Sequence, residues 1–515
     1  MKQYRNLSST METETILKNE ASSKSHMSRR IFRYFYLILI IAGIIGRFEI
    51  QAQDFVSFGE VIDGIRYILW DTNEATVTRS VDVGMNEYSG DIVIPSSIVY
   101  KGVNYSVTEI GYQAFSNCPE LNSVVMPNTV KKIGLFAFED CQNYNSLKSV
   151  TLSNTLEEIG VSAFIGCKEL KSLNLPNSLK RIDDDAFAWC KFNSITIPAS
   201  VTHIGHYIFR ETEIGSISVD SDNPFFSSRD NVIYSKDFSV LITCPSNIAA
   251  YYNSIKEAFV IPNTVKKIED YAFAFCYYSS VTIPESVEDI GDGVFWGVRY
   301  VIKIDLNVNN KSFKILDDAL YNKDITELVY FFKNTGRMNV TIPNTVKKIY
   351  GSAFNGGYSN ENRIVSISLP KSLEHIGYQA VRPGYNSLTE IYSYNPIPPK
   401  TETYEDFYEI VHCKLFVPNG SQDAYSSADG WKYFNNIIEM ADATATEKIS
   451  SDNIHIYATT NGIVIQSDET LPVSVYSITG QKIVDTIIQG IKQISLGKGI
   501  YLVHIGKTSK KVFVY

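Results

Sequence analysis

The sequence predicts a solenoid of stacked strand-and-turn units, in which a parallel concave β-sheet is joined to short convex helical turns or strands. A small C-terminal β-sandwich is expected to follow. Two observations carry this prediction. Units such as SITIPASVTHIGHYIF recur along the middle of the chain, and alternating apolar runs fill the end from residue 454. Self-similarity at a fixed period is the sequence signature of repeat architectures.

The composition bounds the class of protein. A chain of 515 residues has room for two or more domains, and 44% hydrophobic with 20% charged residues is typical of a folded protein. The net charge of −9 opposes nucleic-acid binding, which needs a basic face to neutralise phosphates. We therefore expect a folded multi-domain chain with no nucleic-acid partner.

The N-terminal region, residues 1–52, has the pattern of a secretory signal peptide. Arginines in RRIFR precede an apolar run that ends at Gly46, and Ala52 is a small residue suited to the cleavage position. The run is shorter than the ~20 residues of a membrane-spanning helix. We expect Met27 to be the true start, with export and no transmembrane span in the mature chain. An N-terminal membrane anchor is the alternative.

The repeat unit is marked by the Phe of an Ala-Phe pair, and adjacent copies lie 22 to 27 residues apart. This period, with regularly spaced Leu, Ile and Val, falls in the range of leucine-rich repeats. In the copy at 170–187, Leu173 and Leu175 are expected to face the interior, and Pro176 ends the strand. The marker residues are Phe115, Phe138, Phe164, Phe187, Phe209, Phe273, Phe295 and Phe354, with Val381 in the ninth place.

The order Pro, Ile-Gly, Ala-Phe, Cys in these units resembles the BspA-like leucine-rich repeats of bacterial surface proteins. The resemblance covers about residues 108–390, with irregular inserts at about 219–258 and 305–340. The insert that ends in VLITCP is similar to the longer irregular unit of that family. The resemblance implies a non-catalytic, adhesin-like module whose partner is a protein or glycan on a host or neighbouring cell.

Segments that flank the repeats are expected to protect the open ends of the solenoid. Residues 53–107 are rich in strand patterns and would form an N-terminal cap. Residues 391–440 combine a Pro-rich loop, a last strand and a short amphipathic segment that suit a C-terminal cap. The small polar segment 441–453 is interpreted as a linker.

The C-terminal segment, 454–515, contains about seven alternating apolar runs, which predict a β-sandwich. Its sequence resembles the type A sorting domain of type IX secretion, and Gly480, Gly499 and Tyr501 carry that resemblance. The resemblance implies the type IX machinery as a partner and export across the outer membrane. Release or attachment to the cell surface would follow.

Cysteines recur three residues after the Phe of the pair. No C-x-x-C pair or zinc-finger spacing is present in the sequence. Neighbouring repeats could bring such cysteines within disulfide range, and export permits oxidation. Other copies hold Gly near this position, so we favour a buried packing column, with disulfides or metal as alternatives. The residues are Cys118, Cys141, Cys167, Cys190 and Cys276.

Other polar groups give only weak signals for chemistry. His203 and His206 lie in one repeat, but other copies hold Lys, Glu or Arg at the first position, which favours a solvated site. Asp183, Asp184 and Asp185 lack the spacing of a calcium loop and are interpreted as a solvated turn. No nucleophile, P-loop or metalloprotease motif appears in the sequence. We expect no enzyme activity and no cofactor, with a site in the inserts as the alternative.

The strands supply the candidate binding residues. In SVTL, Val150 and Leu152 point inward, so Ser149 and Thr151 point outward. We predict two columns of small uncharged side chains on the concave sheet, suited to an extended partner. The alternatives are that Thr simply fits strands and Ser is compact, or that the chain is a structural part of the cell envelope. The columns hold Ser149, Thr151, Ser172, Asn174, Ser194, Thr196, Ser216, Ser218, Ser280, Thr282, Ser366 and Ser368.

A group of large aromatic residues near the middle of the chain is a second candidate for binding, because aromatic side chains anchor interfaces. Packing in the core is the alternative for these residues. The group is Tyr277, Tyr278, Trp296 and Tyr300.

Overall fold

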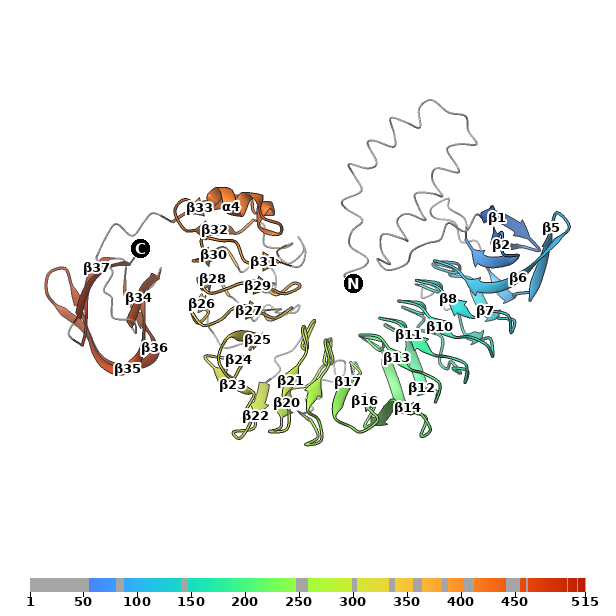
Figure 1. The fold of residues 1–515 in the computed structure, drawn as a ribbon, viewed down its shortest axis with the longest axis horizontal. Coiled ribbons are helices and arrows are strands. Elements are labelled where there is room, and N and C mark those ends of the chain that lie inside the picture. Colours follow the sequence, from blue (N-terminus) through green and yellow to red (C-terminus); the bar gives the residue numbers. More distant parts are fainter. Residues whose placement is uncertain are drawn as a thin grey trace, which may run out of the picture. The chain divides into compact units, whose positions relative to one another are not determined.

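The computed structural model describes most of the chain after residue 54, and Figure 1 shows its elements. The signal-peptide region with Ala52, and the linker 441–453, lie outside the described residues. The described ranges are 55–79, 88–139, 147–246, 258–298, 303–332, 339–354, 364–381, 388–401, 407, 412–440, 454–459, 462–497, 499–506 and 508–514.

Internal contacts divide the chain into two compact units. The first unit holds residues up to 335 together with 349–362 and 377–385, and the second holds 336–348, 363–376 and everything from 386. The fold of both is a leucine-rich-repeat solenoid built almost entirely of short strands and turns, as the sequence predicts. One repeat of this solenoid is called a rung.

The first unit begins with an antiparallel meander. Strand β1 pairs with β2, and β2 with β3. Strand β3 then pairs in parallel with β6, which also forms a hairpin with β5. This sheet covers the first rung, because β6 continues directly into the pairing of the repeats. The bounds are β1 Phe55–Ile62, β2 Ile65–Trp70, β3 Glu74–Thr78, β5 Ser97–Tyr100 and β6 Val103–Ile110.

Each rung contributes one short strand, of two residues in most rungs, to a parallel ladder that we call the Lys-Ile ladder. In the first unit, β6, β8, β10, β11 and β13 pair in succession, and β17, β19 and β21 continue the pattern after the first insert. In the second unit β29 pairs with β31. The bounds are β8 Lys132–Ile133, β10 Glu158–Ile159, β11 Arg181–Ile182, β13 His203–Ile204, β17 Val240–Thr243, β19 Lys267–Ile268, β21 Asp289–Ile290, β27 Lys348–Ile349, β29 His375–Ile376 and β31 Lys400–Thr401.

A second parallel ladder, here called the Ser/Thr ladder, is made by the strands that open the rungs, several of which end just before a Pro. It is broken into the sets β4-β7-β9, β12-β14, β18-β20-β22 and, in the second unit, β26-β28-β30-β32-β33. The bounds are β4 Gly90–Val93, β7 Leu121–Val125, β9 Ser149–Thr151, β12 Lys191–Ile197, β14 Glu213–Val219, β18 Ala258–Val260, β20 Ser280–Ile283, β22 Lys303–Leu306, β26 Asn339–Thr341, β28 Ser366–Leu369, β30 Glu390–Ser393, β32 Lys414–Val417 and β33 Asn436–Glu439.

The two inserts share one design. Each adds an antiparallel hairpin, β15-β16 or β23-β24, whose second strand pairs with β17 or β25. A buried asparagine anchors each insert, because Asn223 Nδ2 donates to the carbonyl of Pro198 and Asn310 Nδ2 to that of Pro284, both at 2.9 Å. The bounds are β15 Phe226–Arg229, β16 Val232–Ser235, β23 Phe313–Leu316, β24 Ala319–Asn322 and β25 Glu327–Phe331.

The Ala-Phe segments form tight turns, which is one of the two forms that the sequence allows, and not single helical turns. The residue two before each marker has a positive φ, and the markers' own N–H groups point along the solenoid. For example, Phe164 N donates to the Ala186 carbonyl at 2.9 Å. These bonds between rungs offset the cost of left-handed backbone. The left-handed residues are Gln113, Phe136, Ser162, Asp185, Tyr207, Tyr271, Gly293, Ser352 and Gln379.

The interior of the solenoid is a stack of phenylalanine rings. The rings of Phe138 and Phe164 are nearly parallel with centroids 5.0 Å apart, and Phe187 follows at 6.0 Å from Phe164. All three side chains are fully buried. No rung can bury its apolar side alone, so each ring is stabilised by its neighbours. The first insert interrupts this stack between Phe209 and Phe273.

The second unit ends its repeats with short helices and then carries the C-terminal sheet. Among the described residues the helices are α4, Gln422–Ser427, and the 3-10 helix η2, Trp431–Tyr433. Trp431 is fully buried and its indole N–H donates to the Pro399 carbonyl at 2.7 Å. This contact ties η2 to the end of the repeats.

The C-terminal sheet is antiparallel, with order β34-β35-β37-β38 and β36 on the other edge of β35. The described residues form five strands where the sequence predicts about seven, because four of the apolar runs merge in pairs. The runs on either side of a register shift between Ser467 and Leu471 form β35, and the runs within 482–495 form β36. The two-layer sandwich itself stays a prediction. The bounds are β34 Ile454–Thr459, β35 Gly462–Ser477, β36 Lys482–Ser495, β37 Gly499–Ile505 and β38 Thr508–Val514.

Candidate binding surface

Strands β12 and β14 hold four of the candidate residues in register. Ser194 pairs with Ser216, and Thr196 pairs with Ser218. An isolated parallel bridge joins Ser172 to Ser194 and extends the first column by one rung. Because parallel strands lie about 4.8 Å apart, the hydroxyl groups of a column recur at that spacing.

The twelve candidates do not form one continuous surface, because the inserts interrupt the columns. Ser280 lies between Ala258 and Lys303, and Ser366 is buried in the second unit beside Asn339. Ser280, Thr282 and Ser368 are half-buried. The exposed members are Ser149, Thr151, Ser172, Asn174, Ser194, Thr196, Ser216 and Ser218, all in the first unit.

The columns stand on the other side of the first unit from the one that the sequence predicts. In Figure 1, β8, β10, β11 and β13 lie on the inner side of its curve, and β7, β12 and β14 lie on the outer side. Strand spacing in a ladder is fixed, so the Lys-Ile ladder, which is continuous from β6 to β13, suits the inside of a bend. The Ser/Thr ladder, which is broken between β9 and β12, suits the outside. The leucine-rich strand pattern alone carried no information on this point.

Most exposed members of the columns make no side-chain hydrogen bond. In the part of the chain that the structure describes, the exception among them is Thr196, whose Oγ1 lies 2.8 Å from Ser218 Oγ. The others are available to a partner. They are Ser149, Thr151, Ser172, Asn174, Ser194 and Ser216.

A second set of hydroxyl groups, which sequence reasoning missed, is structural. The Ser two residues after the strand-ending Pro donates to a carbonyl of the preceding rung. Ser178 Oγ donates to the Leu156 carbonyl and Ser200 Oγ to that of Leu179, both at 2.7 Å. The recurrence of this Ser was visible in the sequence. The carbonyl to which this Ser donates was not visible in the sequence. These structural hydroxyl groups differ from those of the columns, most of which make no hydrogen bond within the fold.

The cysteine column is buried, and the described cysteines are free thiols. Cys167 Sγ lies 3.2 Å from the carbonyl oxygen of Phe138, and Cys190 Sγ lies 3.1 Å from that of Phe164. These two thiols therefore pack against the preceding rung and donate to the carbonyl of its marker, whereas Cys118 Sγ donates to the Ser116 carbonyl of its own rung at 3.7 Å. This arrangement agrees with the packing interpretation, while Cys141 lies outside the described residues.

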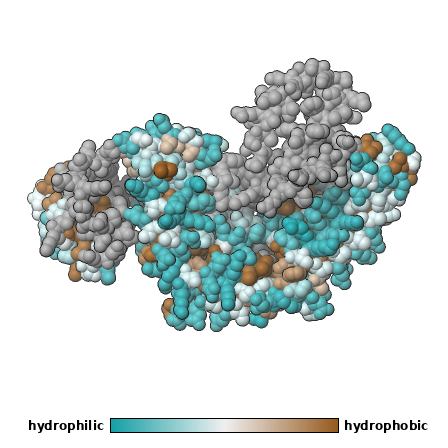
Figure 2. Space-filling view, in the orientation of Figure 1, coloured by the Kyte–Doolittle hydropathy of each residue, from teal (hydrophilic) through white to brown (hydrophobic). Residues whose placement is uncertain are grey.

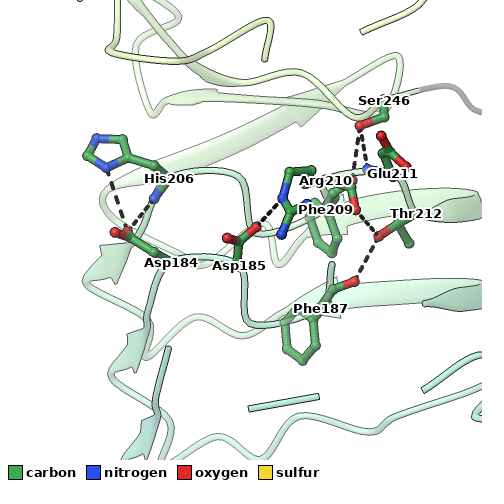
Figure 3. A network of polar contacts seen from close by, with 9 residues as sticks. All are labelled: Asp184, Asp185, Phe187, His206, Phe209, Arg210, Glu211, Thr212 and Ser246. Carbon is green, nitrogen blue, oxygen red and sulfur yellow. Dashed lines mark hydrogen bonds and ion pairs between the residues drawn. The ribbon is translucent and has the colours of Figure 1, made fainter. Parts of the chain in front are cut away.

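Figure 3 shows the same position occupied by an oxygen donor at the first insert. Thr212 takes the place of the cysteine, and its Oγ1 donates to the Phe187 carbonyl at 2.7 Å. Ser246 Oγ likewise donates to the Phe209 carbonyl at 3.4 Å and accepts from Glu211 N at 2.7 Å. The column thus satisfies buried carbonyls whether the donor is sulfur or oxygen.

The acidic turn is solvated only in part, because Asp185 is buried while Asp183 and Asp184 are half-buried. Asp185 is 5% exposed and forms an ion pair with Arg210, whose Nε lies 2.6 Å from Asp185 Oδ1. Asp184 Oδ1 accepts from the backbone N of His206 at 2.7 Å (Figure 3). Burial raises the pKa of Asp183 to about 6, against the lowering effect of Arg181. The sequence could not show this, because the partners come from the next rung.

The first four outward residues of the Lys-Ile ladder in the first unit alternate in charge, and His203 follows them. Glu109, Lys132, Glu158, Arg181 and His203 pair in this order. Lys132 Nζ lies 3.2 Å from Glu158 Oε1. The opposite charges of neighbouring side chains pair with one another, so this column does not offer a single-sign surface to a partner. In the described residues no group of three or more His, Cys, Asp or Glu is placed to hold a metal ion.

Comparison with known protein families matches the BspA type leucine rich repeat region to residues 96–214, 142–248, 246–330 and 323–395, in six copies. Together these matches span more than half of the chain. The chain belongs to the BspA-type leucine-rich repeat family.

Solved structures of other leucine-rich repeat proteins are similar to this chain. The pneumococcal vaccine antigen PcpA is 22% identical, with a TM-score of 0.43, and the match covers 75% of this chain and 100% of that one. A leucine rich cell surface protein from Faecalibacterium prausnitzii (TM-score 0.32) and a leucine-rich repeat protein from Bacteroides ovatus (TM-score 0.32) are also 22% identical. They match 75% of this chain and 96% and 100% of their own. No curated protein matches.

Three members of the aromatic group predicted as a second binding candidate are buried in this BspA-type fold. Tyr277, Tyr278 and Trp296 are each less than 10% exposed, so they pack in the core and are not a binding surface. Tyr300 lies outside the described residues. In the view of Figure 2 the surface of the first unit is mainly hydrophilic, with separate hydrophobic patches.

The residues that carry the C-terminal resemblance lie at strand ends. Gly480 has φ +83 in the turn between β35 and β36, a conformation that favours glycine. Gly499 begins β37, and Tyr501 OH donates to the Gly497 carbonyl at 2.8 Å. Among the described residues, no helix has the length and apolar character needed to span a membrane.

Proposed function

We propose that this BspA-type repeat protein is an exported, cell-surface binding module without catalytic activity. Its partner would be an extended protein or glycan on a host or neighbouring cell. The observation that supports binding is the set of exposed Ser, Thr and Asn side chains of the Ser/Thr ladder that the fold leaves without hydrogen bonds. Neutral donors and acceptors at a regular spacing suit an extended partner whose own hydrogen-bonding groups repeat at a regular spacing and that carries little or no charge.

Binding is tested with the full chain against an array of glycans and purified cell-surface proteins. Ser194→Arg places a long charged side chain in the middle of the columns and is expected to weaken a saturable interaction at least tenfold. Thr202→Arg is the matched control, because Thr202 is exposed in the neighbouring segment away from these strands. Equal binding by both variants would reject the columns as the contact surface. A chain that binds nothing but is needed for envelope integrity would be a structural component.

The C-terminal sheet is proposed to direct export through the type IX secretion machinery. The support is its resemblance in sequence to type A sorting domains, carried by Gly480, Gly499 and Tyr501. Gly480→Val strains a turn with positive φ, so the full chain should be retained in the periplasm of a cell that has this machinery. Ile478→Thr is the control, since Ile478 is 68% exposed in the same turn. Normal surface display of the Gly480 variant would contradict the proposal.

A further inference from the structure

Two cysteines of the buried column show where a thiol at this position of a repeat points. A cysteine three residues after the marker lies against the carbonyl of the marker in the preceding rung, as Cys167 does against Phe138 and Cys190 against Phe164. In ordinary rungs that marker is a phenylalanine, so the thiol meets only a ring and a carbonyl.

The rung made by the first insert differs at this one place. Cys244 N donates to the Ala272 carbonyl at 2.8 Å, just as Phe187 N donates to the Ile208 carbonyl at 3.0 Å. Cys244 therefore stands where the marker phenylalanine would stand. In the second insert Phe331 has the same place, since its N donates to the Ala353 carbonyl at 2.9 Å.

Cys276 is the column cysteine of the next rung, and its thiol points the same way. Its Sγ lies 3.6 Å from the carbonyl oxygens of both Cys244 and Pro245. Because the marker here is itself a cysteine, the two thiols come within hydrogen-bonding reach of each other. Cys244 Sγ lies 3.4 Å from Tyr278 OH, so both sulfurs are fixed by their surroundings.

We propose that Cys244 and Cys276 form an intramolecular disulfide when the chain folds in the presence of a disulfide oxidant. One thiolate attacks a sulfur of the oxidant and releases one thiol. The second thiolate then attacks the mixed disulfide and releases the other. The two cysteines lose two protons and two electrons, and the oxidant is reduced to two thiols. This pairing goes beyond the proposed binding function, although its occurrence in the cell rests on the proposed export.

The timing of the reaction follows from burial. Cys276 is fully buried and Cys244 is 5% exposed. Burial raises the pKa of the Cys276 thiol well above its usual range, which keeps the reactive thiolate scarce in the folded chain. We therefore expect oxidation during folding, before the rungs close over the pair. The bond would join two rungs where the phenylalanine stack is interrupted.

The full chain is refolded from urea in a buffer of glutathione and glutathione disulfide, alkylated under denaturing conditions and mapped by mass spectrometry. We expect five alkylated cysteines and one cross-linked peptide that joins Cys244 to Cys276. The linkage should be lost on reduction. The urea midpoint of the oxidised chain should fall when the same sample is reduced. Seven alkylated cysteines, or a cross-link between another pair, would overturn the proposal.

Variants separate this pairing from general reactivity. Cys276→Ser should leave six alkylated cysteines and no cross-link, whereas Cys190→Ser should retain the Cys244–Cys276 cross-link with four alkylated cysteines. Loss of the cross-link in Cys190→Ser would count against the pairing. Because the readout is covalent and uses no partner, failure here leaves the binding and export experiments unaffected, and their failure leaves this result unaffected.

Discussion

Thr212→Val tests the bond between rungs most directly, because valine has nearly the same shape and removes only the hydroxyl group. Thr212 is 1% exposed, and its Oγ1 donates to the Phe187 carbonyl at 2.7 Å. The variant leaves that carbonyl buried without this donor. A buried acceptor left unsatisfied costs about 1–3 kcal/mol. We expect the free energy of unfolding of the repeats to fall by that amount.

The assay is urea denaturation of the full chain followed by circular dichroism, with midpoints compared at an unchanged slope. Thr202→Val is the matched control, since Thr202 is exposed and its Oγ1 lies 3.3 Å from the Lys180 carbonyl. Its effect should stay within about 0.5 kcal/mol. Thr212→Cys should lose less than the valine variant, because Cys190 makes the same bond naturally. A stability of Thr212→Val equal to that of the control would refute the reasoning.

The other predictions concern the same rungs. Gly205→Ala would place its Cβ 2.5 Å from the backbone N of Asp184, so we expect a loss of about 1–3 kcal/mol in urea. Gly497→Ala, whose nearest contact is 3.9 Å away, should be nearly neutral by the same measurement. Phe164→Ala should lower stability by about 3–5 kcal/mol, seen as a lower melting temperature. Burial raises the pKa of Asp183 to about 6, so the folded chain binds an extra proton between about pH 4 and pH 6. Stability should fall as pH rises through that window, and Asp183→Asn should flatten the dependence.

The repeated features of the fold could be predicted from the sequence, because each rung repeats the same packing problem. The phenylalanine markers, the interior leucines and the buried cysteines recur at fixed offsets. Those that the structure describes lie in the core as expected, except Leu175, which is half-buried against it. The left-handed turns could not be predicted, since bulky residues such as Phe136 and Tyr207 are not those usually found at positive φ. The bonds between rungs impose that conformation, and they connect residues more than twenty positions apart.

The candidate surface was predictable in composition but not in its placement or its limits. Alternation in β12 shows that Ser194 points outward, yet it does not show which side of the curve the strand occupies. The buried pair Asp185–Arg210 was missed for a related reason, because a charged triplet in a turn gives no sign of a partner in the next rung. Side-chain exposure in a solenoid depends on the neighbouring rung as much as on the local pattern.

The first insert limits how far a partner could extend along the columns. The exposed edge of β14 is met by side chains of the insert: Ile217 N donates to Asn231 Oδ1 and Val219 N to Ser228 Oγ, both at 2.9 Å. The β12-β14 set of the Ser/Thr ladder therefore ends at Ser216 and Ser218. Beyond the insert, Lys303 pairs with Ser280 and places a charged side chain in the column that holds serine in β12 and β14. A continuous neutral surface therefore does not form there. A partner held by neutral hydroxyl groups would be confined to the rungs before the insert, and lengthening it past that point should add no affinity.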